Sequence, residues 1–591
     1  MTLVDAEIEI EDPVTPASSP KGRFRISGRG LYISATVALL LYLVVGPLGV
    51  LIFSSFKLTE GFLPFESEAP FSLSNYDTVF LSSSTYNTLQ NTAVYAIGAL
   101  LLSFALAIAL AWLVERTDIP LRNTIYTLVI ASLGIPAVIA GISWGLLGSP
   151  RIGALNVFAR WLFGIDGREG PFNIFSFGGM IVVQALTMVP VTFLLITGAF
   201  RAMDASLEEA ALVSGAGFRQ TIRKISLPVL APALFSALVY QLVTVVESLD
   251  IPLVIGLRSG ISVLSTRVFI EVVPIGGLPN YGVASTFSIL MLFVALGPLL
   301  YYNRLTARAD RFGTVTGKSF SKKRYELGKA KPFAMFAVFL YILMALILPL
   351  LILVWTSLIP FYEVPSRGAL ERVSLDAYRN LQDSEFFLAA LKNTLFVGAL
   401  VAAAVMLLGV VVAWIVVRST SKWARALDVL AYVPHAMPGV IIGTSILLIY
   451  LVLPIPLVGT TWIIIVALST QYTSLSTRLM NGAITQIQVQ LEEAAEVSGA
   501  SQTQIFRKVL LPLIMPPFIN GALLVFLLSI RNLTLALILS SPKAVLLSVL
   551  IFQRWDAGQT EDTAAIGVVL VAITLTLSIV LRKASASGTA R

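Results

Sequence analysis

The sequence predicts an all-α polytopic membrane protein with twelve transmembrane helices, built as two related halves of six helices each. The chain of 591 residues is 57% hydrophobic and only 13% charged. A soluble fold of this length does not need that much apolar surface, so most of the surrounding solvent is lipid. A charged string, Glu-Glu-Ala-Ala-x-Val-Ser-Gly-Ala, occurs twice, starting at Glu208 and at Glu492. A polar segment repeated between apolar stretches indicates a duplicated membrane unit.

The apolar stretches are long enough to cross a bilayer as helices. Backbone polar groups must be satisfied within lipid, so an apolar run of ~20 residues is expected to be helical. The first 30 residues contain no cleavable signal pattern, so the first run is expected to remain as an anchor. The expected spans are residues 31–55, 86–114, 124–147, 178–203, 228–256, 283–303, 332–358, 386–415, 427–452, 460–484, 512–540 and 564–581.

Basic residues define the orientation and the domain boundaries. Lys and Arg are concentrated in the segments on the same side as residue 1, which the positive-inside rule places in the cytoplasm together with both termini. The largest basic cluster is the linker at Arg304–Lys331. We interpret it as a topology signal near anionic lipid rather than as a nucleic-acid site. The expected organisation is a tail 1–30, a first half 31–305, a linker 306–331, a second half 332–582 and a tail 583–591.

The two halves align beyond the charged string. An even number of spans in each half gives both halves the same orientation, so we expect parallel repeats with a pathway at their interface. The first half carries an additional outer segment, residues 148–177, between its third and fourth spans. The matched positions are Asn91-Thr92 with Asn393-Thr394, Trp112 with Trp414, Arg116 with Arg418, and Pro136–Gly141 with Pro438–Gly443.

Each copy of the charged string is expected to form a short surface helix between two spans. Acidic residues in the first turn of 207–213 suit the helix dipole. Gly215 then ends the helix, as a left-handed cap requires, and Pro228 begins the next span. The segment is either a docking surface for a partner or a hairpin that only anchors the spans. Its repetition in both sequence and spacing favours docking.

The repeated segment resembles the EAA motif of permease subunits in binding-protein-dependent ABC importers. The family pattern continues through Gly to Ile-x-Leu-Pro, found here at Ile225–Pro228 and, with Val in place of Ile, at Val509–Pro512. The resemblance implies the type I (MetI-like) importer fold in a bacterial cytoplasmic (inner) membrane. It also implies that the loops 204–228 and 488–512 each dock into one of two ATP-binding subunits. The coupling residues that it implies are Glu208, Glu209, Ala210, Ala211, Gly215, Glu492, Glu493, Ala494, Ala495 and Gly499.

The chain is not expected to bind nucleotide or to be an enzyme. Its nearest approach to a phosphate-binding loop, Gly313–Ser319, has one residue too few between the glycines and lies in the basic linker. With no cysteine, thiolate chemistry is excluded. We therefore expect no catalytic residue and no cofactor on this chain, with ATP and Mg²⁺ on the partner subunits.

A few ionisable or polar groups fall within spans, where they are costly and are default candidates for function. Glu247 and Asp250 lie in the fifth span, and Arg531 and Asn532 lie in the eleventh. The repeat places Glu247 opposite Arg531, so these two residues either pair as a gate, line an aqueous cavity, or are buried structural groups. The lone His435 is expected to pack rather than to bind metal. Weaker candidates for the lining are Gln184, Thr187, Gln471 and Tyr472.

The fusion of two permease domains in one chain is most similar to ferric-iron permeases, which implies import of ferric iron delivered by an extracytoplasmic binding protein. One departure is Ile530–Leu539, where many ferric permeases place Lys-Glu-Leu. Thiamine, polyamine or another small solute are alternative substrates, because selectivity in such importers resides largely in the binding protein. A gradient-driven secondary transporter has a similar shape, but that class leaves the EAA segments without a role. A membrane enzyme is not supported, because the sequence shows no cluster of His or Cys residues and no paired carboxylates of a catalytic kind.

Overall fold

The structure, a computed structural model, describes residues 28–588 apart from 204–205, 275, 307–324 and 420–421. Its regular elements in these ranges are all helices. The expected tail 1–30 and linker 306–331, including Gly313–Ser319, lie largely outside the described residues, as does the end of the tail 583–591.

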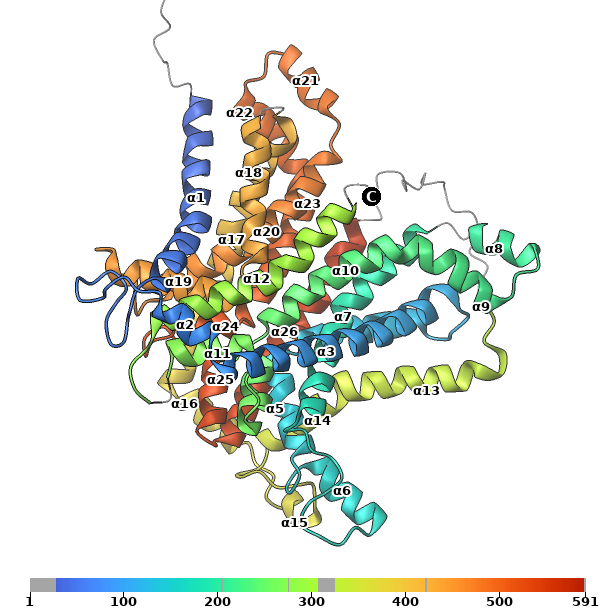
Figure 1. The fold of residues 1–591 in the computed structure, drawn as a ribbon. Coiled ribbons are helices and arrows are strands. Elements are labelled where there is room, and N and C mark those ends of the chain that lie inside the picture. The colour runs from blue at the N-terminus through green and yellow to red at the C-terminus, as the bar shows by residue number, and fades with distance from the viewer. Residues whose placement is uncertain (1–27, 204–205, 275, 307–324, 420–421, 589–591) are drawn as a thin grey trace, which may run out of the picture.

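The two halves contain similar successions of helices (Figure 1), and every expected span contains helix. The first half consists of α1 (Gly28–Ser55), α3 (Ser83–Arg116), α4 (Arg122–Ala131), α5 (Ala137–Gly148), α7 (Phe177–Ala202), α10 (Leu227–Glu247), α11 (Leu264–Val272) and α12 (Tyr281–Thr306). The second consists of α13 (Lys331–Ile342), α14 (Leu348–Ser357), α17 (Glu385–Arg418), α18 (Lys422–Tyr432), α19 (Gly439–Val452), α20 (Thr461–Thr485), α23 (Leu511–Ile530), α24 (Thr534–Leu539), α25 (Leu547–Asp556) and α26 (Thr560–Gly588).

The expected count of twelve spans is not confirmed. In the described residues, 8 helices are long and apolar enough to cross a membrane, or up to 11 if each bent helix pair counts as one span. The third span of each half is bent, by 95° between α4 and α5 and by 103° between α18 and α19. The residue before each proline, Ile135 or Met437, is extended, because a following proline disfavours the helical conformation.

The fifth and eleventh spans end earlier than expected. The sequence predicts helices to residues 256 and 540, whereas α10 ends at Glu247 and α23 ends at Ile530. Ser248 leaves the helix with an extended backbone (ψ 120°). The sequence contains no sign of this break, because Pro252–Gly256 is apolar like the span before it. In the structure these residues are apolar because they are buried within the protein. The polar residues that follow each helix therefore lie at helix ends.

Equivalent hydrogen bonds hold the segment after each break. The Thr92 hydroxyl accepts the Leu264 N–H at 3.0 Å, and the Thr394 hydroxyl accepts the Leu547 N–H at 2.8 Å. The asparagine that precedes each threonine donates to a carbonyl of the same segment. The paired Asn-Thr positions therefore make equivalent hydrogen bonds in both halves, which confirms the alignment made from sequence.

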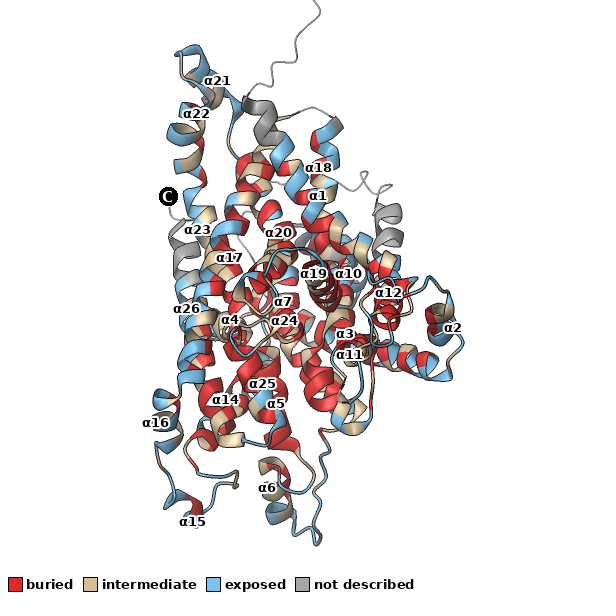
Figure 2. Cartoon of the chain, turned by 90° about the vertical axis from the view of Figure 1, so that its left-hand side faces the viewer, coloured by how far each residue is buried: buried red, intermediate tan, exposed pale blue. Residues whose placement is uncertain are grey.

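The halves interlock through their first helices. Helix α1 packs against α12 of its own half and against α19 of the other, while α14 packs against α26 and against α5 of the other half. Leu40 of α1 is fully buried in a cluster with Val412, Leu427 and Ala431 of the second half. Figure 2 shows buried residues concentrated where α5, α19, α24 and α25 lie, with exposed residues on the peripheral helices.

Long helices approach closely where one of them presents glycine. A Cβ atom added to Gly409 of α17 would lie 2.8 Å from the Ser476 Oγ atom and 2.9 Å from its backbone carbonyl carbon on α20. Small residues at helix interfaces permit such contacts in membrane proteins, where dispersion rather than the hydrophobic effect drives association.

Gly409→Ala is therefore expected to lower the free energy of unfolding by about 1–3 kcal/mol, the usual cost of overpacking. Gly482→Ala on α20 is the matched control, because a Cβ atom there meets nothing within 4 Å. Thermal unfolding of both variants in detergent is the measurement. Equal stabilities would show that α17 and α20 are not closely packed at this point.

Candidate functional site

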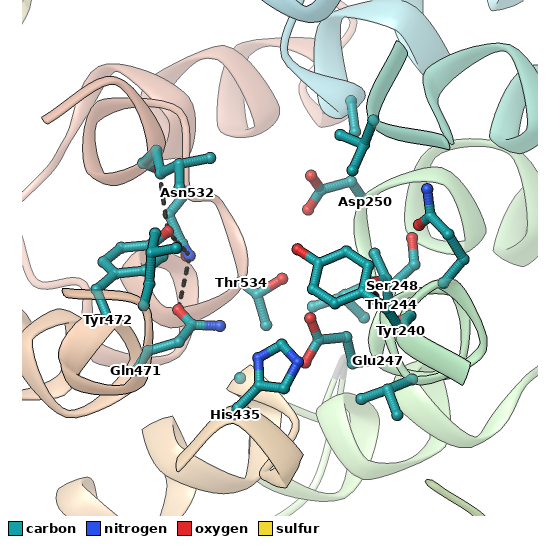
Figure 3. A pocket seen from close by; sticks show the side chains of 18 of the residues that line it. Tyr240, Thr244, Glu247, Ser248, Asp250, His435, Gln471, Tyr472, Asn532 and Thr534 are labelled. Carbon is teal, nitrogen blue, oxygen red and sulfur yellow. Dashed lines mark hydrogen bonds between the residues drawn. The ribbon is translucent and has the colours of Figure 1, made fainter. Parts of the chain in front are cut away.

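A cavity of about 540 Å³ lies between the two halves and is bordered by α7, α10, α20 and the breaks that follow α4, α10, α18 and α23. Figure 3 shows side chains from both halves directed into the same space. The structure brings all the sequence candidates for a pathway into this one cavity: Gln184, Glu247, Asp250, Gln471, Arg531 and Asn532, together with Thr187 and Tyr472.

On the first-half side, hydrogen bonds fix the amide of Gln184. Its Oε1 atom accepts the Tyr95 hydroxyl at 2.8 Å and the Ser248 hydroxyl at 3.1 Å. Tyr95 belongs to α3 and is 1% exposed. Gln184 therefore orients Ser248, the first residue beyond α10, and helps to define the break there.

On the second-half side, Asn532 organises the equivalent break. Its Nδ2 atom donates to the Gln471 Oε1 atom at 3.0 Å and to the Tyr472 hydroxyl at 3.2 Å, as Figure 3 shows. The Tyr472 hydroxyl donates in turn to the Leu528 carbonyl at 3.1 Å. This polar network joins α20 to the end of α23, so the lining is held by hydrogen bonds on both sides.

Glu247 and Arg531 occupy equivalent positions but do not form the ion pair that the sequence left open. The Glu247 carboxylate interacts with the backbone N–H of Gly439, the first residue of α19. The Arg531 guanidinium donates to the carbonyl of Leu133, in the turn that ends α4. A helix N-terminus favours an anion and a C-terminus favours a cation. The two side chains therefore cap opposite ends of the broken spans, each in the other half.

Asp250 supplies the second carboxylate of the cavity. Its partners are the Thr534 hydroxyl and the charge of Arg531, so Asp250 rather than Glu247 is the electrostatic neighbour of Arg531. The Asp250 Oδ1 atom is buried and has no hydrogen-bond partner.

Sequence reasoning missed several lining residues. Tyr240 and Thr244 precede Glu247 on the same helical face, and that i, i+4, i+7 spacing was the available signal. His435 also lines the cavity, and its ring lies 5.3 Å from the Tyr240 ring and 5.4 Å from the Tyr432 ring. Over the described residues, no group of three or more His, Cys, Asp or Glu could hold a metal. The contacts of His435 are those of a packed aromatic ring.

The first EAA segment has the predicted shape of a helix, a glycine turn and a second short helix. Helix α8 (Ser206–Val213) ends at Gly215, which has φ +82°. The Ala216 N–H reaches back to the Ala211 carbonyl at 3.0 Å, the bond that defines a Schellman cap. Helix α9 (Phe218–Thr221) and one π turn (Ile222–Ser226) then lead into α10, whose Pro228 cannot donate a helical hydrogen bond.

The second EAA segment repeats this geometry. Helix α21 (Val489–Val497) ends at Gly499, also with φ +82°. The Ala500 N–H donates to the Ala495 carbonyl at 3.0 Å. Helix α22 (Gln502–Ile505) and a π turn (Phe506–Leu510) lead into α23. Figure 1 shows the two segments apart from each other, on the opposite side of the molecule from α15 (Arg367–Leu370) and α16 (Asp376–Asp383).

A buried arginine fixes the first EAA segment to the membrane helices. Arg116, the last residue of α3, lies 3.7 Å from Glu208, and their side chains are 5% and 9% exposed. Its guanidinium also donates to the carbonyls of Phe200 and Met203 at the end of α7, at 3.1 and 3.4 Å. A cation there complements the helix dipole. The other Glu208 oxygen accepts the Ser226 hydroxyl at 2.6 Å.

Arg418 makes the same contacts in the second half. It lies 2.7 Å from Glu492 and donates to the carbonyls of Ile484 and Ile487 at the end of α20. The position equivalent to Ser226 is Leu510, which has no hydroxyl group, and here the arginine approaches the carboxylate more closely. The sequence matched the two arginines but gave no indication of their partners. We name these contacts the arginine clamps.

A further ion pair ties the second half to this end of the molecule. The Asp118 carboxylate accepts the Lys331 ammonium at 2.7 Å and the Leu327 N–H at 2.9 Å. The hydrogen bond from Lys331 is the main cause that lowers the pKa of Asp118 below its ordinary value. The stabilisation is therefore present above the unfolded-state pKa and is lost as the pH falls through the folded-state pKa.

The exposed face of each EAA segment includes a prominent apolar side chain. Val213 and Val497 occupy equivalent positions, and each is 90% exposed. They are the most exposed large apolar side chains in the described part of the chain. Glu493 is exposed as well. Each segment is thus fixed to the membrane helices by its arginine clamp and exposes a valine to solvent.

Arg116→Met should lower the free energy of unfolding by about 3–5 kcal/mol, because it leaves the Glu208 carboxylate buried without its cation. Hydrogen exchange of residues 206–213 should also accelerate. Arg201→Met is the matched control, because its pair with Glu115 lies at the same end but Arg201 is 50% exposed and is worth about 0–1 kcal/mol. If the two variants are equally stable and exchange alike, the clamp does not hold the segment.

Comparison with known proteins agrees with this arrangement. The family model described as "binding-protein-dependent transport system inner membrane component" matches residues 103–311 and 405–584. The ferric transport system permease protein FbpB of Actinobacillus pleuropneumoniae is 23% identical over 434 residues, 72% of this chain and 61% of that protein. The Fe(3+)-transport system permease protein FbpB 2 of Haemophilus influenzae is 22% identical over 488 residues, 82% of this chain and 87% of that protein.

The chain spans about 60% of the length of the first relatives, 61% of one and 57% of the other. A solved bacterial alginate ABC transporter, in complex with a pentasaccharide-bound periplasmic protein, matches with a TM-score of 0.40 and 20% identity over 48% of this chain and 96% of that one. The family model matches one copy in each half and more than half of the chain in total. This chain belongs to the binding-protein-dependent transport system inner membrane components, with two copies of the domain fused in one polypeptide.

Proposed function

We propose that this chain is a membrane permease subunit of an ATP-driven importer. It receives substrate from an extracytoplasmic binding protein and passes it inward by alternating access. Two ATP-binding subunits, one at each EAA segment, hydrolyse ATP on the cytoplasmic side, where both termini of this chain also lie. The relatives named as ferric-transport permeases support ferric iron as the substrate.

The observation that carries this proposal is the duplicated EAA segment with its arginine clamp. A surface that only anchored spans would not need a rigid base and a 90% exposed valine at equivalent points of both halves. The repetition of this exposed valine at equivalent points of two rigidly held segments supports a protein contact there. Because each segment is joined through Arg116 or Arg418 to two membrane helices, movement of a docked partner would be transmitted to the spans that border the cavity.

Val213→Arg/Val497→Arg should abolish co-purification with the ATPase encoded beside this chain, because two charged side chains would replace the apolar contacts. The wild type should carry two ATPase subunits for each chain. The measurement is subunit stoichiometry after purification in mild detergent, with thermal unfolding of the membrane subunit as a check of folding.

Glu60→Arg/Glu371→Arg is the matched control, because it introduces two arginines at exposed positions far from the EAA segments. This variant should retain the ATPase. Retention of the ATPase by the valine variant would contradict the proposal that the EAA segments are docking surfaces. If the wild type transports without ATP, the gradient-driven class replaces the proposal.

Contacts between the halves on the side opposite the EAA segments suggest how the pathway is closed to the outside. The Arg258 guanidinium lies 4.5 Å from the Trp555 ring of the other half. The Tyr362 hydroxyl donates to the Leu146 carbonyl at 2.6 Å, also across the halves. In the proposed cycle, rocking of the halves would break these contacts while the clamps keep each EAA segment attached to its own half.

The chemistry of the cavity is compatible with a hard cation in transit. Carboxylates and hydroxyls are the ligands that hard cations take, and the lining supplies them at Glu247, Asp250, Tyr240 and Thr534. The Asp250 Oδ1 atom has no partner. Arg531 offsets part of the negative charge, which would favour passage of the ion over tight retention. A polyamine or thiamine would be distinguished by direct competition in an uptake assay.

Glu247→Gln should reduce uptake roughly tenfold, a barrier increase of about 1.4 kcal/mol, because it replaces one of the two carboxyl groups that the cavity offers to a cation. Uptake of radioactive ferric iron into proteoliposomes with the binding protein is the measurement. Glu271→Gln, which alters a carboxylate paired with Arg267 outside the cavity, should transport normally. Normal uptake by a folded Glu247→Gln variant would remove Glu247 from the pathway.

A further inference from the structure

The additional segment of the first half contains a helix that buries an asparagine and exposes large apolar side chains. Helix α6 (Ala154–Phe163) buries Asn156 and Ala159, whereas Phe158, Trp161, Leu162 and Phe163 are 56%, 76%, 54% and 71% exposed. A surface helix of a water-soluble domain would bury the aromatic residues and expose the asparagine. The second half has no counterpart, because only residues 453–460 separate α19 from α20.

Hydrogen bonds hold this inverted arrangement in place. The Asn156 amide donates to the carbonyls of Ser149 and Phe172 at 2.8 and 2.7 Å, and its oxygen accepts the Phe172 N–H at 2.9 Å. Arg160 donates to the carbonyls of Arg168 and Arg151 at 2.9 and 3.0 Å. The polar side chains are satisfied within the segment itself. The outward aromatic face is therefore a rigid feature of the fold.

Helix α6 lies next to the membrane-spanning part of the molecule. Helix α6 packs against α5, which packs in turn against α14, and α14 exposes Leu351 and Val354. Both ends of the segment lie at the ends of membrane helices, since α5 ends at Gly148 and α7 begins at Phe177. In Figure 1, α6 projects from the edge of the fold beside α15, and Figure 2 shows it at the same edge.

We propose that α6 is an interfacial helix that inserts its aromatic face into the outer leaflet of the bilayer. Trp and Phe are enriched on the apolar faces of helices that lie in the plane of a membrane. Arg151 and Glu169, an exposed ion pair 3.1 Å apart, remain at the water side. The helix anchors the far end of α5 to the membrane in the first half only.

A lipid surface accounts for this face better than the binding protein does. A binding protein docks only during part of the transport cycle, which would leave four large apolar side chains in water for the remainder. Contiguous exposed apolar surface of this kind is an aggregation liability in water, whereas the bilayer covers it at all times. The inference depends on membrane insertion of the chain and is independent of the transported substrate.

Nitroxide labels on single cysteines test the proposal, because the natural chain has no cysteine. Trp161→Cys and Phe163→Cys place labels on the aromatic face, and Asp166→Cys is the control on the exposed loop of the same segment. Each labelled chain is reconstituted in nanodiscs of phosphatidylcholine and phosphatidylglycerol. Collision rates with oxygen, which partitions into lipid, and with a water-soluble nickel chelate are then measured by power saturation.

The proposal predicts an oxygen-to-nickel accessibility ratio at 161 and 163 several times that at 166. Two labelled positions on the face keep the test decisive if one variant folds poorly. Nickel accessibility at 161 and 163 equal to that at 166 would overturn it. Nickel access that disappears only when the binding protein is added would also overturn it, and would identify α6 as a docking helix instead.

Discussion

The constraint on which this structure depends is that backbone polar groups cannot be left unsatisfied in lipid. Both halves nevertheless interrupt their third and fifth spans, before Pro136 and Pro438 and after Glu247 and Ile530. Non-helical backbone is tolerated at membrane depth only where protein or a water-filled cavity surrounds it. The four breaks meet this condition by gathering around one cavity between the halves. The position of the cavity is therefore a consequence of where the helices are allowed to stop.

The same breaks explain how one fold carries a carboxylate and a guanidinium at equivalent points. A broken span exposes both a helix C-terminus and a helix N-terminus, which attract opposite charges. Glu247 caps the N-terminus of α19, and Arg531 caps the turn that ends α4. Each cap crosses between the halves. The caps thus couple the lining of the cavity to the relative position of the halves, whereas each arginine clamp ties an EAA segment to membrane helices of its own half.

Much of this arrangement could be predicted from sequence, because it rests on local rules. The helical core of each expected span, the left-handed glycines at 215 and 499 and the equivalence of the Asn-Thr pairs followed from apolar runs and the internal repeat. The sequence did not predict the bends, because the prolines lie inside apolar runs long enough for a straight span. The partners of Glu247, Arg531 and Arg116 include backbone groups or residues distant in the chain, and no spacing pattern encodes such contacts.

The central claim is that ATP hydrolysis on partner subunits drives inward transport through this chain. The most direct test is uptake of ferric iron by proteoliposomes that contain the reconstituted complex, with the loaded binding protein outside and ATP inside. Ionophores that collapse proton and sodium gradients should leave this uptake unchanged, and removal of ATP should abolish it. Uptake that continues without ATP and stops with the ionophores would contradict the account and assign the chain to the gradient-driven transporters.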